Sequence, residues 1–255
     1  ESRKKSIKRF YHLLIKRHIF GITSPLRVLP DFFVIGPGRT GTTSLFYYLN
    51  EHPCLVKSAY DELGFFDVNF HLGLQWYRSL FPTIFTKRKI KSKTNHFQTY
   101  DVSPSYVRRP WVARRMHELF PKSKHIVVLR NPVDKTYSHY YLAGFKFDKN
   151  NKPINKQRTE LRSFEDVIND DMKNIEKFHN EPKNDYYFGS YVEKSFLARG
   201  FYIEQLPIWF KLFSKDQILV ISSEDLSIKT RSTLKIIFKF LNLPDYDPKN
   251  IEKVS

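Results

Sequence analysis

A glycine-containing turn at residues 36–41 joins a short apolar run to a stretch that begins a helix. The apolar run, residues 32–35, predicts a buried strand, and the helix opens with Thr42, Thr43 and Ser44. Glycine lets the backbone turn tightly, and the N–H groups at a helix N-terminus attract anions. The residues therefore predict an anion site of the kind that holds phosphate groups.

The spacing of Gly36 and Gly41 is that of the G-x-x-x-x-G-K-[ST] loop of nucleotide triphosphatases. Thr42 stands where that loop has the lysine that reaches the β- and γ-phosphates, so an NTP-dependent phosphotransferase would lack its main positive charge. The basic residue of this loop is Arg39, which we expect to project toward the terminal group of the ligand. A strand-to-helix turn without a ligand is the structural alternative.

A second basic residue follows another predicted strand. Residues 125–129 are apolar after the first position, Arg130 comes next, and Pro132 suits the first turn of a helix. Ser138 then lies less than two turns into that helix, so its hydroxyl and the Arg130 guanidinium could share an anion. Two anion sites at strand ends predict a ligand with two separated phosphates.

These two segments resemble the phosphosulfate loop and the 3′-phosphate motif of the sulfotransferases that use 3′-phosphoadenosine 5′-phosphosulfate, PAPS. The chain resembles in particular the branch with the heparan sulfate N- and O-sulfotransferases and bacterial carbohydrate sulfotransferases. Further similar segments follow in the family's order between residues 30 and 245: E-x-x-F-F from Glu62, G-x-x-W-Y from Gly73, the acidic strand end from Asp101, and R-G-x-Y from Arg199. The resemblance implies that the donor is bound by Gly38, Arg39, Thr40, Gly41, Thr42, Thr43, Ser44, Arg130, Ser138 and Tyr202.

The resemblance also implies the reaction, in which a sulfuryl group passes from PAPS to a hydroxyl or an amine, leaving 3′,5′-adenosine bisphosphate, PAP. The expected acceptor is a small molecule or glycan, with a carbohydrate favoured. Glu62 is the expected general base, and Arg39 would stabilise charge on the leaving oxygen. Asp101 is the second candidate for the base, and an ordinary surface carboxylate is the alternative for Glu62. No metal is expected, because the sequence has no H-x-x-x-H pair and no cysteine cluster.

Three features depart from the family pattern. Arg39 replaces a lysine that is common in the loop, and a forked guanidinium is not a point-charge ammonium. Val102 stands where the heparan sulfate enzymes have a lysine, so a second cation near the sulfuryl group is missing there. The sequence ends at Ser255, which predicts that the segment closing over the donor is truncated.

The composition predicts an anionic partner. With 43 Lys and Arg against 26 Asp and Glu, the formal net charge is +17. The charges are scattered, and the sequence has no helix-turn-helix, zinc or RRM-type signature, so nucleic acid is not the expected partner. A non-catalytic protein that binds an anionic glycan or nucleic acid remains the alternative function. The Lys-rich residues 146–158 read as an exposed loop, which could form one wall of an acceptor cleft.

Strands and helices alternate along most of the chain, which predicts a single α/β domain with a P-loop-type parallel sheet covered by helices on both faces. The predicted strands are 32–35, a short one near Leu55, 98–101, 125–129 and 217–221. The predicted helices are 42–51, 72–80, 109–119, 132–143, 164–178, 190–213 and 229–241. We expect a basic N-terminal extension at 1–29, with helix-like spacing of apolar residues at 4–17, and a sulfotransferase domain at 30–255.

No apolar run is long enough to predict a transmembrane segment. The single cysteine, Cys54, excludes an intramolecular disulfide and predicts a small buried side chain. It favours the cytoplasm, whereas the Golgi lumen fits if an N-terminal anchor has been removed. The oligomeric state stays open.

Overall fold

The computed structural model describes residues 21–143, 162–180 and 195–249. Its centre is a five-stranded sheet with the order β2-β3-β1-β4-β5. Every neighbouring pair is parallel, and the register of β1 against β4 shifts between Val34 and Gly36. The strands are β1 Phe32–Gly36, β2 Leu55–Lys57, β3 Gln98–Val102, β4 Lys124–Leu129 and β5 Ile218–Ser222.

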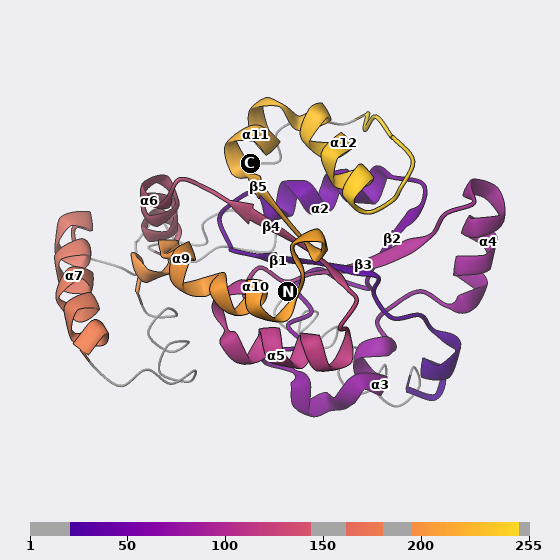
Figure 1. Cartoon of the computed structure of the whole chain (residues 1–255), viewed down its shortest axis with the longest axis horizontal. Helices are drawn as coiled ribbons and strands as arrows, with labels where there is room; N and C mark the ends of the chain where they lie inside the picture. The colour runs from indigo at the N-terminus through magenta and orange to yellow at the C-terminus, as the bar shows by residue number, and fades with distance from the viewer. Residues whose placement is uncertain (1–20, 144–161, 181–194, 250–255) are drawn as a thin grey trace, which may run out of the picture.

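Helices cover both faces of this sheet, as the alternation predicted (Figure 1). In β1, Phe32 and Val34 pack into a core with α2 and α12, whereas Phe33 and Ile35 pack into a second core with α3, α5 and α10. Side chains alternate between the faces of a strand, and both faces are buried here. The expected α/β class with a parallel, doubly covered sheet is therefore confirmed.

The helices are α2 Thr42–Glu51, α3 Gly73–Arg78, α4 Ile84–Thr94, α5 Pro110–Leu119, α6 Pro132–Ala143, α7 Phe164–Asn180, α9 Tyr202–Gln205, α10 Pro207–Leu212, α11 Ser223–Ile228 and α12 Thr230–Phe240. Short 3-10 turns lie at η2 Ser24–Leu26, η3 Phe70–Leu72, η4 Tyr106–Arg108, η5 Ala198–Gly200 and η6 Lys215–Gln217. The predicted helices 42–51 and 132–143 have the observed bounds.

The continuous helix predicted at 190–213 is wrong over its described part. Residues 195–212 form η5, α9 and α10 as separate short elements, and Pro207 begins α10 because its ring has no N–H to extend a helix. Two helices were also missed. The lysine-rich α4 has no buried residue, and in α11 the hydroxyl of Ser222 caps the N–H of Asp225. The expectations for residues 4–17 and 146–158 lie outside the described residues.

The expectation that Cys54 is a small buried side chain is confirmed. Trp76 and Trp209 are core residues as well. Among the helices described, none combines the length and apolarity needed to cross a membrane.

The carboxyl ends of β1, β3 and β4 lie at one edge of the sheet, where open parallel sheets bind ligands. The glycine loop leaves from β1, residues 103–108 leave from β3, and Arg130 follows β4. Helix α6 and the short elements η5 and α9 lie beside this edge (Figure 1).

Candidate active site

The loop after β1 is shaped by close contacts of its backbone. Gly36 has φ 103°, and a Cβ built there would lie 2.0 Å from the carbonyl oxygen of Pro104, so only glycine fits. Thr40 is fully buried, and its hydroxyl donates to the carbonyl of Pro37 at 2.7 Å. Thr40 can therefore offer a ligand its backbone but not its side chain. Arg39 has φ 68°, which holds a side-chain-bearing residue in the left-handed region at the tip of the loop.

Helix α2 begins directly after this loop. Gly41, with φ 87°, is its N-cap residue, and among the described residues no side chain makes a cap hydrogen bond there. Thr42 is buried, while Thr43 is exposed and Ser44 is half-buried. The ten-residue helix thus presents its positive end to the carboxyl edge of the sheet, as the anion-site hypothesis requires.

The two predicted anion motifs meet at this edge. The Arg39 guanidinium donates to the hydroxyl of Ser138 at 3.4 Å, and Arg130 donates to the carbonyl of Arg39 at 3.4 Å. Both distances exceed the usual N–H···O range of about 2.7–3.2 Å, so these hydrogen bonds are long and weak. Burial and the nearby Arg130 lower the pKa of Arg39, which shows that these two cations lie within electrostatic reach of each other.

Tyr202 lies beside the second motif but binds its backbone. Its hydroxyl donates to the carbonyl of Arg130 at 2.9 Å. Burial raises the pKa of Tyr202 to about 12, so the phenol stays a donor at neutral pH. Tyr202 thereby fixes the turn at which Arg130 leaves β4.

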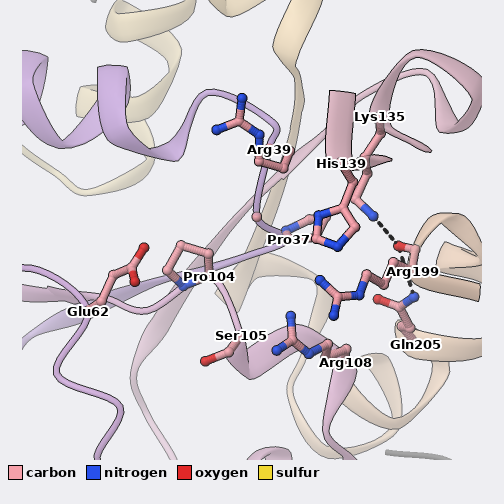
Figure 2. A pocket seen from close by; sticks show the side chains of 11 residues that line it. Pro37, Arg39, Glu62, Pro104, Ser105, Arg108, Lys135, His139, Arg199 and Gln205 are labelled. Atoms are coloured by element: carbon pink, nitrogen blue, oxygen red, sulfur yellow. Dashed lines mark hydrogen bonds between the residues drawn. The ribbon is translucent and has the colours of Figure 1, made fainter. Parts of the chain in front are cut away.

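A pocket of about 360 Å³ adjoins the loop and extends toward α6 and η5. Figure 2 shows that its walls come from several separate segments of the chain. Among its charged lining residues, four are cationic and Glu62 is the carboxylate. The lining residues are Pro37, Gly38, Arg39, Glu62, Pro104, Ser105, Arg108, Lys135, His139, Arg199 and Gln205.

Glu62 reaches the pocket from the loop after β2. Its N–H donates to the carbonyl of Val102 at 2.9 Å, and its φ of 54° is again left-handed. Burial and the neighbouring Asp61 raise the pKa of Glu62, while Arg108 opposes this rise. A carboxylate with a raised pKa is a better proton acceptor, which suits a general base.

Asp101, the second candidate base, is separated from this pocket lining. It is fully buried at the end of β3, where it accepts hydrogen bonds from the hydroxyls of Tyr77, Ser103 and Tyr106 at 2.8 to 3.0 Å. Burial raises its pKa to about 6, although the three hydroxyls oppose the rise. The hydroxyl of Tyr106 also accepts a hydrogen bond from the N–H of Phe65, so Asp101 supports, through Tyr106, the segment that follows Glu62.

The wall opposite Glu62 is strongly cationic. Lys135 and His139 come from successive turns of α6, Arg108 from η4 and Arg199 from η5. Burial and the positive charges of Arg199 and Arg108 lower the pKa of Lys135 to about 7. Burial together with Arg199, Lys135, Arg108 and Arg39 lowers the pKa of His139 to about 3, so its imidazole is neutral at working pH.

Part of this cationic wall was not predicted from the sequence. Arg108, Lys135, His139 and Gln205 line the pocket but carried no predicted catalytic or donor-binding role. A signal was present for two of them: Lys135, Ser138 and His139 are spaced i, i+3 and i+4, which puts them on one face of a helix. Arg199 belonged to the R-G-x-Y segment, but the family pattern assigned it no task.

The described residues contain no group of three or more His, Cys, Asp or Glu side chains placed to hold a metal ion. The donor set around the loop is instead cationic and hydroxylic, which suits phosphate and sulfonate oxygens. His125, another histidine of these motifs, is fully buried and stacks on Phe33, so it belongs to the core.

Comparisons with known proteins place this geometry in a family. The sulfotransferase domain family model matches residues 29–254. The bifunctional heparan sulfate N-deacetylase/N-sulfotransferase 2 of Bos taurus is 27% identical over 224 residues, which cover 86% of this chain. The membrane-associated sulfotransferase kil1 of Dictyostelium discoideum is 25% identical over 291 residues, covering 90% of this chain. The chain spans 22% of the length of the first relative and 60% of the second.

Among solved structures, a sulfotransferase from Alicyclobacillus acidocaldarius has a TM-score of 0.60 with 21% identity, and the match covers 89% of this chain and 87% of that one. At 21% identity, this comparison shows a shared fold. The family model covers nearly the whole chain, and the motifs behind the sequence resemblance lie within the matched range. The chain therefore belongs to the sulfotransferase domain family.

Proposed function

We propose that this chain transfers the sulfuryl group of PAPS to a carbohydrate hydroxyl or amine and releases PAP. The observation that carries the proposal is the contact between Arg39 and Ser138, because it joins the two anion motifs beside a pocket that holds one carboxylate. A donor with two separated anionic ends needs two such motifs at one edge of the sheet.

The donor would be held at both ends by this chain's own groups. The N–H groups at the start of α2 and the Arg39 guanidinium suit the 5′-phosphosulfate, with Gly38, Thr40 and Gly41 contributing backbone and Thr42, Thr43 and Ser44 the first turn. Arg130 and Ser138 suit the 3′-phosphate. Tyr202 acts on the donor through Arg130, whose carbonyl it binds.

The transfer is an in-line displacement at sulfur. A lone pair of the acceptor oxygen or nitrogen forms the new bond to sulfur, while the bond from sulfur to the bridging oxygen breaks and its electrons stay on the PAP phosphate. Arg39 and the loop N–H groups would stabilise that negative charge. The proton lost by the acceptor passes to Glu62, whose raised pKa suits this task.

Glu62 is the favoured base because it lines the pocket. Asp101 lies off that lining and accepts three hydroxyl hydrogen bonds, so its proposed part is to hold the strand end and the segment after Glu62. Asp101 becomes the base only if turnover survives the loss of the Glu62 carboxylate.

A carbohydrate acceptor is supported by the polarity of the pocket. Of its lining side chains, those of Pro37 and Pro104 are the apolar ones, so a bare hydrocarbon ring would find little to pack against. Guanidinium groups and an amide at the walls offer hydrogen bonds to the hydroxyl groups of a sugar. The first relatives carry heparan sulfate in their names, which agrees with a sugar acceptor.

The test is transfer of ³⁵S from labelled PAPS to a panel of oligosaccharides, phenols and lipids. We expect labelled oligosaccharide, loss of transfer in Glu62→Gln, and retained chemistry in correctly folded Asp101→Asn. Transfer to phenols or lipids alone would contradict the carbohydrate assignment, and absence of transfer to any acceptor would contradict the reaction.

A further inference from the structure

Lys135 is a buried lysine in the wall of the pocket. It lies in α6 one turn before Ser138 and His139, and its residue is only 2% exposed although it lines the pocket. Burying an ammonium group is expensive unless it is strongly hydrogen-bonded. The contacts of the Lys135 amino group therefore indicate the role of its positive charge.

The amino group binds the backbone of a segment that is distant in sequence. Its Nζ donates to the carbonyl oxygen of Arg199 at 2.5 Å (Figure 2). The side-chain amide of Gln205 donates to the same carbonyl at 3.2 Å and to the carbonyl of Ala198 at 3.0 Å. We call residues 198–205 the Arg199 segment. Lys135 of α6 binds this segment from outside, and Gln205 binds it from within the segment itself.

Two further contacts attach the Arg199 segment to the beginning of α6. Tyr202 donates to the carbonyl of Arg130, and a Cβ built on Gly200 would lie 3.1 Å from the Cβ of Pro132. The segment therefore lies close against the turn that carries Arg130. In this arrangement one backbone segment connects the donor-binding turn with the pocket wall that holds the Arg199 side chain.

The positive charges of Arg199 and Arg108 oppose this arrangement, whereas the face of the Tyr202 ring favours it. The groups that face Lys135 are Arg199 and the Tyr202 ring from the Arg199 segment, Arg108 from η4 and His139 from α6, and the Tyr202 ring centre is 5.8 Å from Nζ. Burial and the two arginines lower the pKa of Lys135 to about 7. An apolar side chain would fill this place at lower cost, so packing alone does not account for a lysine here.

We propose that Lys135 is a positioning residue for the transfer, holding the Arg199 segment on α6 so that the acceptor wall keeps its place relative to Arg130 and Ser138. The proposal rests on the sulfuryl transfer proposed above. It differs from a donor-binding role, because the bond from Nζ goes to a backbone carbonyl of the opposite wall.

The attachment of the Arg199 segment to Lys135 should depend on pH. A charged donor makes a stronger hydrogen bond than a neutral amine, so the attachment weakens as Lys135 loses its proton above pH about 7. In Lys135→Arg the guanidinium stays charged over this range. Wild type should therefore loosen at alkaline pH, and Lys135→Arg should not.

The experiment compares wild type, Lys135→Met and Lys135→Arg, with Lys122→Met as the matched control at an exposed lysine. Hydrogen exchange of residues 198–205 is measured from pH 6 to 9 and corrected for the intrinsic rate, together with PAP affinity and transfer to chitin and heparosan hexasaccharides. We expect at least tenfold faster exchange in Lys135→Met, a PAP Kd within threefold of wild type, and a tenfold lower kcat/KM for the acceptor. Lys135→Arg should restore slow exchange and abolish its increase above pH 7.

Exchange in Lys135→Met equal to that of Lys122→Met would overturn the inference, as would loss of PAP affinity in step with activity, which would make Lys135 a donor ligand. If Lys135→Met does not fold, Gln205→Met removes the other donor to the Arg199 carbonyl. Exchange should then rise while the pH dependence persists, and unchanged exchange overturns the inference. Failure of the proposed function is seen separately, as absent PAP binding in wild type, because exchange is measurable without any ligand.

Discussion

The guanidinium of Arg39 lies 3.4 Å from the hydroxyl of Ser138, although 99 residues separate them in the chain. Arg39 belongs to the loop after β1 and Ser138 to α6 after β4, and these two strands are neighbours in the sheet. The strand order thus brings together the two motifs that the sequence identified separately. A ligand with two anionic ends would engage both residues, so their spacing limits what can bind.

Removing the Arg39 charge should affect the chemical step more than donor binding. We expect Arg39→Ala to lower kcat about 100-fold or more, because a preorganised charge at a leaving oxygen contributes on that scale. Arg39→Lys should recover part of this rate, because the ammonium group keeps the positive charge but lacks the forked geometry of the guanidinium. Single-turnover transfer measures this, with Arg88→Ala on the exposed face of α4 as control. Equal rates in Arg39→Ala and Arg88→Ala would contradict the role.

Protonation of Glu62 should lower the rate of the reaction at acidic pH, which gives the pH–rate profile an acidic limb. Its pKa is raised by burial and by Asp61, so kcat/KM should increase as pH rises through a value above the ordinary carboxylate range and then level off. Glu62→Gln should lose this limb and about 10²- to 10⁴-fold of the rate. A pH–rate profile of both proteins is the measurement. Turnover that persists in Glu62→Gln would move the base to Asp101.

Asp101→Asn should act on stability, with a defined pH dependence. The folded-state pKa of Asp101 is about 6, above its ordinary value of 3.8, so its ionisation costs stability progressively as pH rises through this window. An amide has one acceptor oxygen where the carboxyl group has two, so the variant cannot keep all three hydroxyl bonds. We expect this loss to cost about 1–3 kcal/mol, with the larger penalty near pH 4.5 and a smaller one at pH 7. Urea unfolding at the two pH values tests this, and a penalty that grows with pH would refute it.

His125 should make the fold sensitive to acid. Burial lowers its pKa to about 3 in the folded protein, so below pH 6.5 the unfolded chain binds a proton that the folded protein does not. Stability should fall by about 1.4 kcal/mol for each pH unit from 6.5 toward 3 on account of this residue. His125→Phe keeps an aromatic ring beside Phe33 and Phe213 and should reduce that slope. An unchanged slope in chemical unfolding between pH 6 and 4.5 would exclude this explanation.

The sequence sufficed for the elements that carry the donor motifs. The apolar run of β1, the glycine turn and the hydroxyl residues of α2 are local signals, and Pro132 marked the start of α6 correctly. Strand ends with basic residues then predicted the edge of the sheet at which Arg39, Arg130 and Ser138 meet.

The acceptor side could not be predicted in the same way, because it is assembled by tertiary contacts. Arg108 reaches the pocket through a 3-10 turn, and Lys135 is buried through its bond to a carbonyl 64 residues away. Asp101 was singled out as a candidate base, but its burial among three hydroxyls depends on Tyr77, Ser103 and Tyr106 meeting in space. The broken helix at 195–212 shows the same limit, since its apolar spacing alone does not show where Pro207 begins a new helix.

The central claim is that one site binds both anionic ends of an adenine nucleotide. It is tested most directly by thermal shift with PAP, adenosine 5′-phosphate and Mg·ATP, on wild type and Ser138→Ala. At a PAP concentration about 100-fold above Kd, we expect the Tm of wild type to rise by roughly 5 to 10 °C. Adenosine 5′-phosphate should raise the Tm of wild type much less. In Ser138→Ala, PAP and adenosine 5′-phosphate should raise the Tm by similar amounts. No stabilisation by PAP, or a larger stabilisation by Mg·ATP, would contradict the account.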